Sequence, residues 1–310
     1  MLFDFIYNLY HVKFSNKKLD SFYLRVITRF ANLFLPAYFK LTFNLNSNFL
    51  KQNVNRTKDD KMYIVSLTTF PARIDKVWLT IESILRQKEK PDKILLWLYE
   101  GEFKGKNSLP KNLLRLEKKG LEIRFCKENL MPHKKYYYTM LEYPNANVIT
   151  IDDDMFYPLN LIFKLKSYHK IYPNEILSPI SRKIRFDSNT ISEYKNWYYN
   201  KNNSKPSVVF LPIGVGSVLY PADSLHKEVL DIESIKKYAL KADDLWLKIM
   251  SLKNKTKVVS LASEYSRFPI PVFHKNNITL MSQNIGEGKN DEIFKLLLEE
   301  YKISISSLQD

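Results

Sequence analysis

The stretch "MYIVSLTTFPARIDKVWLTIESILRQ" (62–87) changes its hydrophobic periodicity at a proline turn. Residues 62–70 are a nearly continuous apolar run that ends in Thr-Thr-Phe-Pro, which predicts a buried strand followed by a turn. Beyond the turn, apolar residues recur at the three- and four-residue spacing of one helical face. These residues are Ile74, Val77, Ile81, Ile84 and Leu85. The stretch therefore predicts a strand that leads directly into an amphipathic helix.

The same alternation of strand and helix continues to residue 152. Strands are predicted at 92–99, 121–126 and 147–152, and helices at 110–120 and 133–143. Strands that alternate with helices build a parallel sheet through right-handed crossovers, with helices on both faces. In such sheets, ligands bind beyond the carboxyl ends of the strands, where the strand order reverses. A site is therefore expected in the loops after the first, third and fourth strands.

The composition is that of a folded protein with a large excess of positive charge. Of the 310 residues, 45% are hydrophobic and 14% aromatic, which is typical of a globular chain. The single cysteine, Cys126, excludes an intrachain disulfide framework and a zinc site built on several thiolates. It also favours a reducing compartment. The net charge of +15 favours anionic partners, although lysines that only keep the protein soluble explain it equally well.

Residues 1–60 are predicted to form a helical extension and a linker ahead of one domain at 61–310. From Phe22 to Phe39, apolar residues recur at helical spacing. Basic residues interrupt this region, so it holds no apolar span long enough to cross a bilayer; they are Arg25, Arg29 and Lys40. Two interpretations stay open: the helix lies on an anionic membrane surface, or it packs against the main domain. The polar residues 46–61 are typical of a linker.

Three consecutive aspartates follow the fourth predicted strand in "NVITIDDDMFYP" (147–158). Like charges repel, and a cluster of hard oxygen ligands suits Mg²⁺ or Mn²⁺, which would offset that repulsion. Because side chains alternate along a strand, Asp152 and Asp154 are expected to face one way and Asp153 the other. The alternative is that the acids cap a helix that begins near residue 154, but capping requires only one of them.

Several ordered motifs together resemble bacterial GT-A glycosyltransferases of surface and capsular polysaccharide gene clusters. They are "IVSLTTFPARI", "TIESILRQKEKPDKILLWL", "VITIDDDMFYP", "PIGVGSVLYP" and "ADDLWL". The exostosin C-terminal domain is a more distant likeness. The resemblance covers about residues 62–291. It implies an α/β fold of GT-A type, with a Rossmann-like, mostly parallel sheet flanked by helices behind the N-terminal helical extension.

The resemblance also implies a divalent cation, Mn²⁺ or Mg²⁺, and a nucleotide-diphosphate sugar donor, most commonly a UDP-sugar. A nucleoside diphosphate leaves poorly unless its charge is neutralised, and a metal at an Asp-x-Asp-type motif supplies that neutralisation. Asp154 is the first candidate ligand and Asp152 the second. Many GT-A enzymes complete the metal shell with a late histidine, which makes His274 a third candidate.

Contacts to the donor are expected from several loops. The candidates are Thr68, Thr69 and Arg73 after the first strand, Lys134 and Lys135 after the third, Asp152 and Asp153 after the fourth, Gly214 and Gly216 within 206–221, and Asn290 and Asp291 near the last helix. Hydroxyls can bond a base or ribose, cations can reach a diphosphate, and glycines let a sugar approach the main chain. Ordinary turns and a bulged buried strand are the structural alternatives. The segment 286–291 resembles the family's C-terminal signature and is expected to close over the donor as a lid.

Two adjacent acids, Asp243 and Asp244, open a predicted helix in "LKADDLWLKIM" (240–250). One of them is expected to cap the helix, and the other to act as general base on an acceptor hydroxyl. Asp244 is preferred as the base by a narrow margin. This assignment favours inversion of the anomeric centre, whereas the exostosin likeness favours retention.

The resulting hypothesis is a hexosyltransferase that transfers sugar to a lipid-linked glycan in cell-surface polysaccharide or lipopolysaccharide synthesis. Such an enzyme is expected in the cytoplasm, with peripheral contact to the inner membrane face through residues 1–45. One alternative is a non-catalytic sugar-binding protein on the same fold. The other is a metal-dependent protein that acts on nucleic acid, but no nucleic-acid-binding signature supports it, so no nucleic-acid partner is expected.

Overall fold

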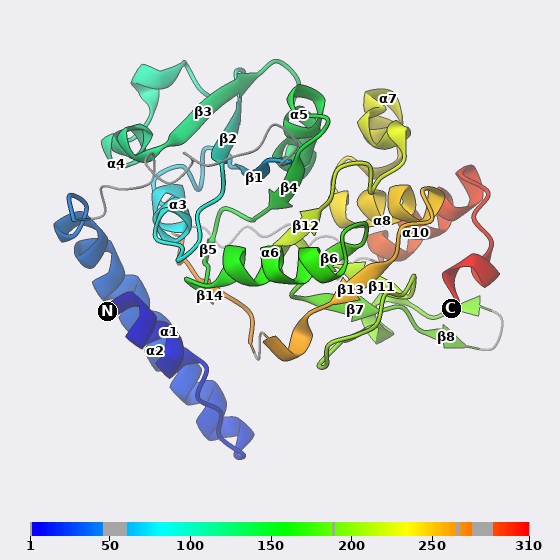
Figure 1. Cartoon of the computed structure of the whole chain (residues 1–310), viewed down its shortest axis with the longest axis horizontal. Helices are drawn as coiled ribbons and strands as arrows, with labels where there is room; N and C mark the ends of the chain where they lie inside the picture. The colour runs from blue at the N-terminus through cyan, green and yellow to red at the C-terminus, as the bar shows by residue number, and fades with distance from the viewer. Residues whose placement is uncertain (1, 46–60, 188–189, 265–266, 275–287, 310) are drawn as a thin grey trace.

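The computed structural model describes residues 2–45, 61–187, 190–264, 267–274 and 288–309. Within these residues the chain is an α/β protein with a mixed, mostly parallel seven-stranded sheet flanked by helices (Figure 1). The strand order is β13-β6-β12-β4-β1-β2-β3, and β12 runs antiparallel to both of its neighbours. The strands are β1 (Tyr63–Thr68), β2 (Lys93–Tyr99), β3 (Leu121–Cys126), β4 (Asn147–Thr150), β6 (Ile176–Ser178), β12 (Val218–Tyr220) and β13 (Val258–Ser260).

The predicted alternation of strands and helices up to the fourth strand is confirmed. The connecting helices are α3 (Val77–Leu85), α4 (Lys111–Leu114) with the 3₁₀ segment η3 (Arg115–Lys119), and α5 (Lys134–Glu142). β4, β1, β2 and β3 pair in parallel in that order. β4 therefore lies beside β1 although it is fourth in the chain. The strand order reverses between these two strands, so the loops that follow them leave the sheet side by side.

The sheet separates two layers of apolar side chains because successive residues of a strand point to opposite faces. On β1, Val65 and Leu67 belong to a core that also contains α3, α6 (Leu161–Ile171) and the N-terminal helices. Ile64 belongs to a separate cluster on which Tyr138 of α5 packs. A third core joins α8 (Asp243–Lys253) to α10 (Lys289–Glu300). The sheet is thus held rigidly on both sides, and its loop-bearing edge is fixed.

Short elements complete the described part of the fold. A small sheet has the order β10-β7-β11, β5 pairs with β14, and β8 pairs with β9. These strands are β5 (Met155–Phe156), β7 (Ser181–Lys183), β8 (Phe186–Asp187), β9 (Thr190–Ile191), β10 (Tyr198–Tyr199), β11 (Phe210–Pro212) and β14 (Ile270–Pro271). The remaining helical segments include η6 (Gly214–Gly216), α7 (Ile232–Ser234) and η8 (Ile235–Ala239).

The region of the three aspartates differs from the sequence prediction. β4 ends at Thr150, so the aspartates lie in the turn between β4 and β5 rather than on a strand. The helix that follows begins only at Leu161, and its N-cap residue is Asn160. The capping interpretation of the aspartates is therefore wrong: their neighbours Met155 and Phe156 pair as a strand with β14.

The N-terminal segment forms two helices, α1 (Leu2–Tyr10) and α2 (Lys17–Leu41), which pack against the domain (Figure 1). The rings of Phe3 and Phe39 lie 6.3 and 6.2 Å from the ring of Phe156, centroid to centroid. The predicted helix at 22–39 is confirmed and is longer than predicted. Within the part of the chain that the structure describes, no helix is long and apolar enough to cross a membrane. The predicted linker lies outside the described residues, apart from Lys61.

Candidate functional site

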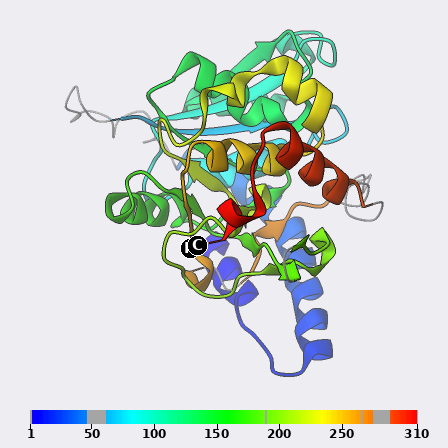
Figure 2. The same cartoon turned by 90° about the vertical axis from the view of Figure 1, so that its right-hand side faces the viewer.

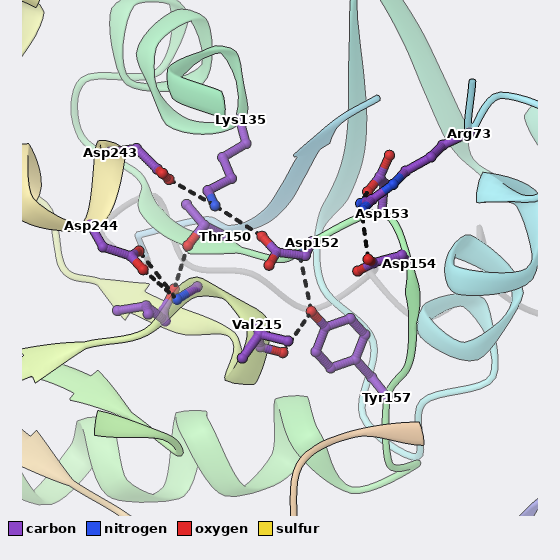
Figure 3. Close-up of polar contacts among 12 residues, drawn as sticks. Arg73, Lys135, Thr150, Asp152, Asp153, Asp154, Tyr157, Val215, Asp243 and Asp244 are labelled. Atoms are coloured by element: carbon purple, nitrogen blue, oxygen red, sulfur yellow. Dashed lines mark hydrogen bonds and ion pairs between the residues drawn. The ribbon is translucent and has the colours of Figure 1, made fainter. Parts of the chain in front are cut away.

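Charged side chains from four segments, together with the backbone of a fifth, meet at the edge of the sheet where the strand order reverses (Figure 3). The loops after β1 and β4 supply Arg73 and the three aspartates, and α5 supplies Lys135. The first turn of α8 supplies Asp243 and Asp244, and η6 supplies the backbone of Gly214. We call these residues the acidic cluster: Arg73, Lys135, Asp152, Asp153, Asp154, Gly214, Asp243 and Asp244.

Arg73 binds two of the three consecutive aspartates. Its Nη1 lies 2.6 Å from Oδ1 of Asp153 and 2.9 Å from Oδ2 of Asp154. The hydroxyl of Thr69 donates to the second oxygen of Asp153 at 2.5 Å. Asp153 and Asp154 thus share a cation while Asp152 contacts another one, so the predicted strand-like alternation is wrong. The reason is that the aspartates lie beyond the end of β4, where a turn replaces the two-residue repeat.

Lys135 connects the aspartate turn to α8. Its Nζ lies 2.9 Å from Oδ1 of Asp152 and 2.8 Å from Oδ2 of Asp243. Burial alone would lower the pKa of Lys135, but Asp152, Asp243 and Asp244 outweigh it and raise that pKa well above its usual value. Burial alone would likewise raise the pKa of Asp243, but Lys135 and then His133 reverse the shift and lower it. Lys135 and Asp243 are therefore a buried, charged pair.

Asp244 accepts hydrogen bonds from the main chain instead of from a cation. The Gly214 amide lies 3.2 and 3.3 Å from its two carboxylate oxygens. Burial first, and then the neighbouring charge of Asp243, raise the pKa of Asp244 to about 8, against the opposing effect of Lys135. The N-cap position of α8 is Ala242, which makes no side-chain capping bond. The expectation that one of the two acids caps the helix is wrong, and both acids face the cluster.

Gly214 lies where the charged groups approach one another most closely. A Cβ at this position would lie 2.8 Å from Nζ of Lys135 and 3.3 Å from Oδ1 of both Asp152 and Asp244. Only glycine leaves these side chains undisturbed while its amide reaches Asp244. The predicted close approach to the main chain is therefore present at Gly214, and the groups that approach it are the protein's own charges.

Two residues that the sequence did not single out support the aspartate turn. The hydroxyl of Tyr157 accepts the amide hydrogen of Asp152 at 2.9 Å and donates to the carbonyl of Val215 at 3.2 Å. The hydroxyl of Thr80, on α3, donates to the carbonyl of Asp153 at 2.9 Å. Both side chains are fully buried polar groups. Thr80 could have been suspected because it is polar and lies between the apolar residues Leu79 and Ile81 of α3.

The acidic cluster contains five carboxylates but only two side-chain cations. Burial, Asp153 and Asp152 raise the pKa of Asp154 to about 7, and Arg73 only partly opposes them. This local excess of negative charge occurs in a chain whose overall net charge is +15. It costs folding free energy, because buried like charges repel, so the site is electrostatically prepared for an additional cation.

Other predicted site residues contact groups outside this cluster. The hydroxyl of Thr68 donates to the carbonyl of Trp97 at 2.9 Å, and Nζ of Lys134 donates to Oδ1 of Asn129 at 2.6 Å. Oδ1 of Asp291 accepts the amide hydrogen of Tyr194 at 2.6 Å. The neighbouring Asn290 is buried at the start of α10. Thr68, Lys134 and Asp291 thus make hydrogen bonds outside the acidic cluster, and donor binding by these residues and Asn290 stays a prediction. The predicted lid residues 286 and 287 lie outside the described residues.

Gly216 packs against an apolar side chain and not against the charges. A Cβ at this position would lie 2.6 Å from Cβ of Ile180. Gly216→Ala is therefore expected to lower the free energy of unfolding by about 1–3 kcal/mol, because the backbone must move to admit a methyl group. Urea denaturation measures this change. A loss below about 0.5 kcal/mol would mean that the contact is not tight and would contradict the packing role.

His274 lies near the cluster but does not complete a metal site with it. Burial, then Arg73 and Lys76, lower the pKa of His274 to about 4, so its ring is neutral. Its Nε2 is buried and has no hydrogen-bond partner among the described residues. Within the same residues, no group of three or more His, Cys, Asp or Glu side chains is arranged to hold a metal ion. The set of Asp152, Asp154 and His274 is thus not preassembled, and metal binding stays a prediction.

Comparison with protein-family models gives no match to this chain, and neither does comparison with curated proteins. The resemblance to GT-A glycosyltransferases therefore remains an expectation that the sequence motifs alone carry.

Proposed function

We propose that this protein is a metal-dependent glycosyltransferase that uses a nucleotide-diphosphate sugar and glycosylates a hydroxyl of a lipid-linked glycan. The observation that carries the proposal is the unbalanced acidic cluster at the point where the sheet reverses its strand order. This is where open α/β sheets bind their ligands. A diphosphate is negatively charged and is repelled by the five carboxylates of the cluster. It would therefore enter the site together with a metal cation.

Asp152 and Asp154 are the residues that would hold this cation. Their side chains are 30% and 18% exposed, whereas those of Asp153 and Asp243 are 7% and 12% exposed. Mg²⁺ is usually bound through one or two protein carboxylates together with substrate phosphates, so two accessible aspartates fit it without a third protein ligand. When bound, the metal would neutralise the charge that develops on the departing diphosphate.

The chain's own residues would orient the reactants and move the proton. The guanidinium of Arg73 can turn from the aspartates to phosphate oxygens, to which it is geometrically suited. Asp244 would accept the proton of the acceptor hydroxyl, and its pKa of about 8 lies close to neutral pH, as general bases require. Lys135 keeps Asp243 ionised and positions the start of α8. This arrangement favours inversion at the anomeric carbon.

Thermal unfolding with UDP-, GDP- and dTDP-sugars, each with and without Mn²⁺, tests the proposal. One donor is expected to raise the melting temperature by several degrees only when Mn²⁺ is present, since a ligand at a hundred times its Kd stabilises by about 2.7 kcal/mol. Chelation with EDTA should abolish the shift. Asp154→Asn should abolish it as well, whereas Asp187→Asn, which alters an exposed acid on β8, should not.

A non-catalytic sugar-binding protein is the second candidate. Arg73 and Lys135 already pair with four of the aspartates, so these four are paired with cations without a metal. Donor hydrolysis separates the two functions. If the unchanged protein binds a donor but neither hydrolyses it nor transfers its sugar, the enzymatic proposal is wrong. If it does transfer sugar and Asp244→Asn keeps the wild-type rate, the assignment of Asp244 as general base is wrong. If no donor and no metal changes the melting temperature, both candidates fail.

A further inference from the structure

We propose that α2 docks on an anionic membrane surface through the side of the helix that faces away from the domain. This proposal goes beyond the glycosyltransferase function and does not depend on it. Eleven of the eighteen exposed large hydrophobic side chains in the described part of the chain lie within residues 2–45. Exposed apolar side chains that gather on one element mark a contact surface, whereas scattered ones do not.

Most of these side chains form one stripe along α2. Its members are Phe22, Val26, Phe30, Leu33, Phe34 and Leu41, and each lies three, four or seven residues from another member. Such spacing places them on one side of the helix. Leu33 is 71% exposed and Leu41 is 83% exposed, and the rings of Phe30 and Phe34 lie 4.2 Å apart. We call these six residues the apolar stripe.

Basic residues border the stripe, and no acid does. Lys18, Arg25 and Arg29 are exposed and fall on the adjoining side of the helix. The one acid of α2, Asp20, is turned away and binds Arg267 at 2.6 Å. Within the described residues, neither Arg25 nor Arg29 forms an ion pair. An apolar face bordered by cations is typical of helices that lie in the interface of an anionic bilayer.

The opposite side of α2 is fixed to the domain. Ile27, Ala31, Leu35 and Phe39 are buried in the core that also contains α3. α2 is therefore firmly attached to the domain, and a loose attachment does not explain why the stripe is exposed. α2 lies along one side of the molecule, and the connection between α1 and α2 projects beyond the domain (Figure 2). Such a surface can meet a flat bilayer without rearrangement of the fold.

The same helix is linked to the acidic cluster through β14. Asn32 of α2 donates to the carbonyl of Pro271 and accepts the amide hydrogen of Phe273, at 2.8 and 2.7 Å. The intervening residue, Val272, donates its amide hydrogen to the carbonyl of Asp154 at 2.7 Å. One extended segment thus separates α2 from the aspartate turn. A protein docked through α2 would hold the cluster at a fixed position close to the lipid headgroups.

A second copy of the chain is a less suitable occupant of the stripe. Two identical stripes in contact would bring their basic borders together, and like charges at an interface oppose association. Anionic headgroups instead complement the same charges, each Lys or Arg near such a surface contributing roughly fivefold to the affinity. The charge of the border therefore favours lipid.

Co-sedimentation of the full chain with vesicles tests the inference. Binding is expected to vesicles of mixed phosphatidylcholine and phosphatidylglycerol, and to weaken at least about tenfold without the anionic lipid or at high salt. The double variant Phe30→Ser/Phe34→Ser should lose at least about tenfold in binding because it removes two exposed rings from the stripe. Arg25→Glu/Arg29→Glu should lose a similar factor through charge.

Matched changes elsewhere serve as controls. Phe163→Ser/Ile171→Ser removes two apolar side chains of α6 that are even more exposed than Phe30 and Phe34, and Lys195→Glu/Lys295→Glu reverses two exposed charges. Both controls should bind vesicles nearly as the unchanged chain does. Unchanged circular dichroism would establish that the α2 variants remain folded. The inference is overturned if the unchanged chain ignores anionic vesicles, or if stripe and control variants lose binding equally. A lipid-free dimer that Phe30→Ser/Phe34→Ser dissociates would also overturn it, by assigning the stripe to self-association.

Discussion

Lys135→Met is expected to lower the free energy of unfolding by about 3–5 kcal/mol, which is typical when one partner of a buried ion pair is removed. Asp152 and Asp243 would lose their shared cation, and Asp244 would lose the charge that partly offsets burial. Methionine nearly preserves the volume of lysine, so the loss reports charge and not a cavity. Urea denaturation at neutral pH measures it.

Lys134→Met is the matched control for this change. Lys134 is adjacent in sequence and at least as buried, but its Nζ contacts only the neutral side chain of Asn129 among the interactions described. Burial lowers the pKa of Lys134, which means that its charge destabilises the fold. Removing this charge should therefore lower the free energy of unfolding only slightly. Equal losses in the free energy of unfolding of the two variants would show that the stabilising effect of Lys135 comes from its packing and not from its ion pairs with the aspartates.

Asp244→Asn is expected to stabilise the protein while it abolishes sugar transfer. Asparagine can still accept the hydrogen bond from Gly214, but it carries no charge into the crowded cluster. Loss of a general base typically lowers the rate by a factor of about 10²–10⁴. The gain in the free energy of unfolding should be on the order of 2 kcal/mol at a pH above the pKa of Asp244.

The pH dependence of that gain follows from the direction of the shift. The pKa of Asp244 is raised from 3.8 in the unfolded chain to about 8 in the fold, so the native state holds a proton that the unfolded state releases. The stability of the unchanged protein therefore falls as the pH rises through this window. Asp244→Asn should match the unchanged protein below about pH 4, and its advantage should grow until about pH 8. A difference that does not vary with pH would contradict the raised pKa.

Much of the fold could be predicted from the sequence because its signals are local. The apolar run of β1, the helical spacing of α3 and the glycine after η3 each identify an element without knowledge of distant residues. Right-handed crossovers then place the ends of β1 and β4 at the same edge. β12 was harder to predict, since nothing within residues 218–220 shows that this strand runs antiparallel between β4 and β6.

The candidate site could be predicted only in part. Asp152 to Asp154, Arg73, Lys135 and Asp244 do meet, because each lies just beyond a strand or at a helix start. Asn290 and Asp291 were chosen from a motif resemblance. The structure buries Asn290 at the start of α10 and bonds Asp291 to the amide of Tyr194, so their contact with a donor stays a prediction. Strand alternation also failed to predict how the aspartates face, because β4 ends two residues before the first of them.

The sequence by itself determined the order of strands and helices up to the fourth strand, the location of the acidic residues after that strand, and the amphipathic character of the N-terminal helix. Those properties depend on neighbours within a few residues of one another. Only the tertiary structure decided which cation neutralises which aspartate, that Asp244 has none of its own, and that the outer side of α2 stays exposed. Charge pairing and burial depend on residues brought together from distant segments, and no local pattern specifies such partners.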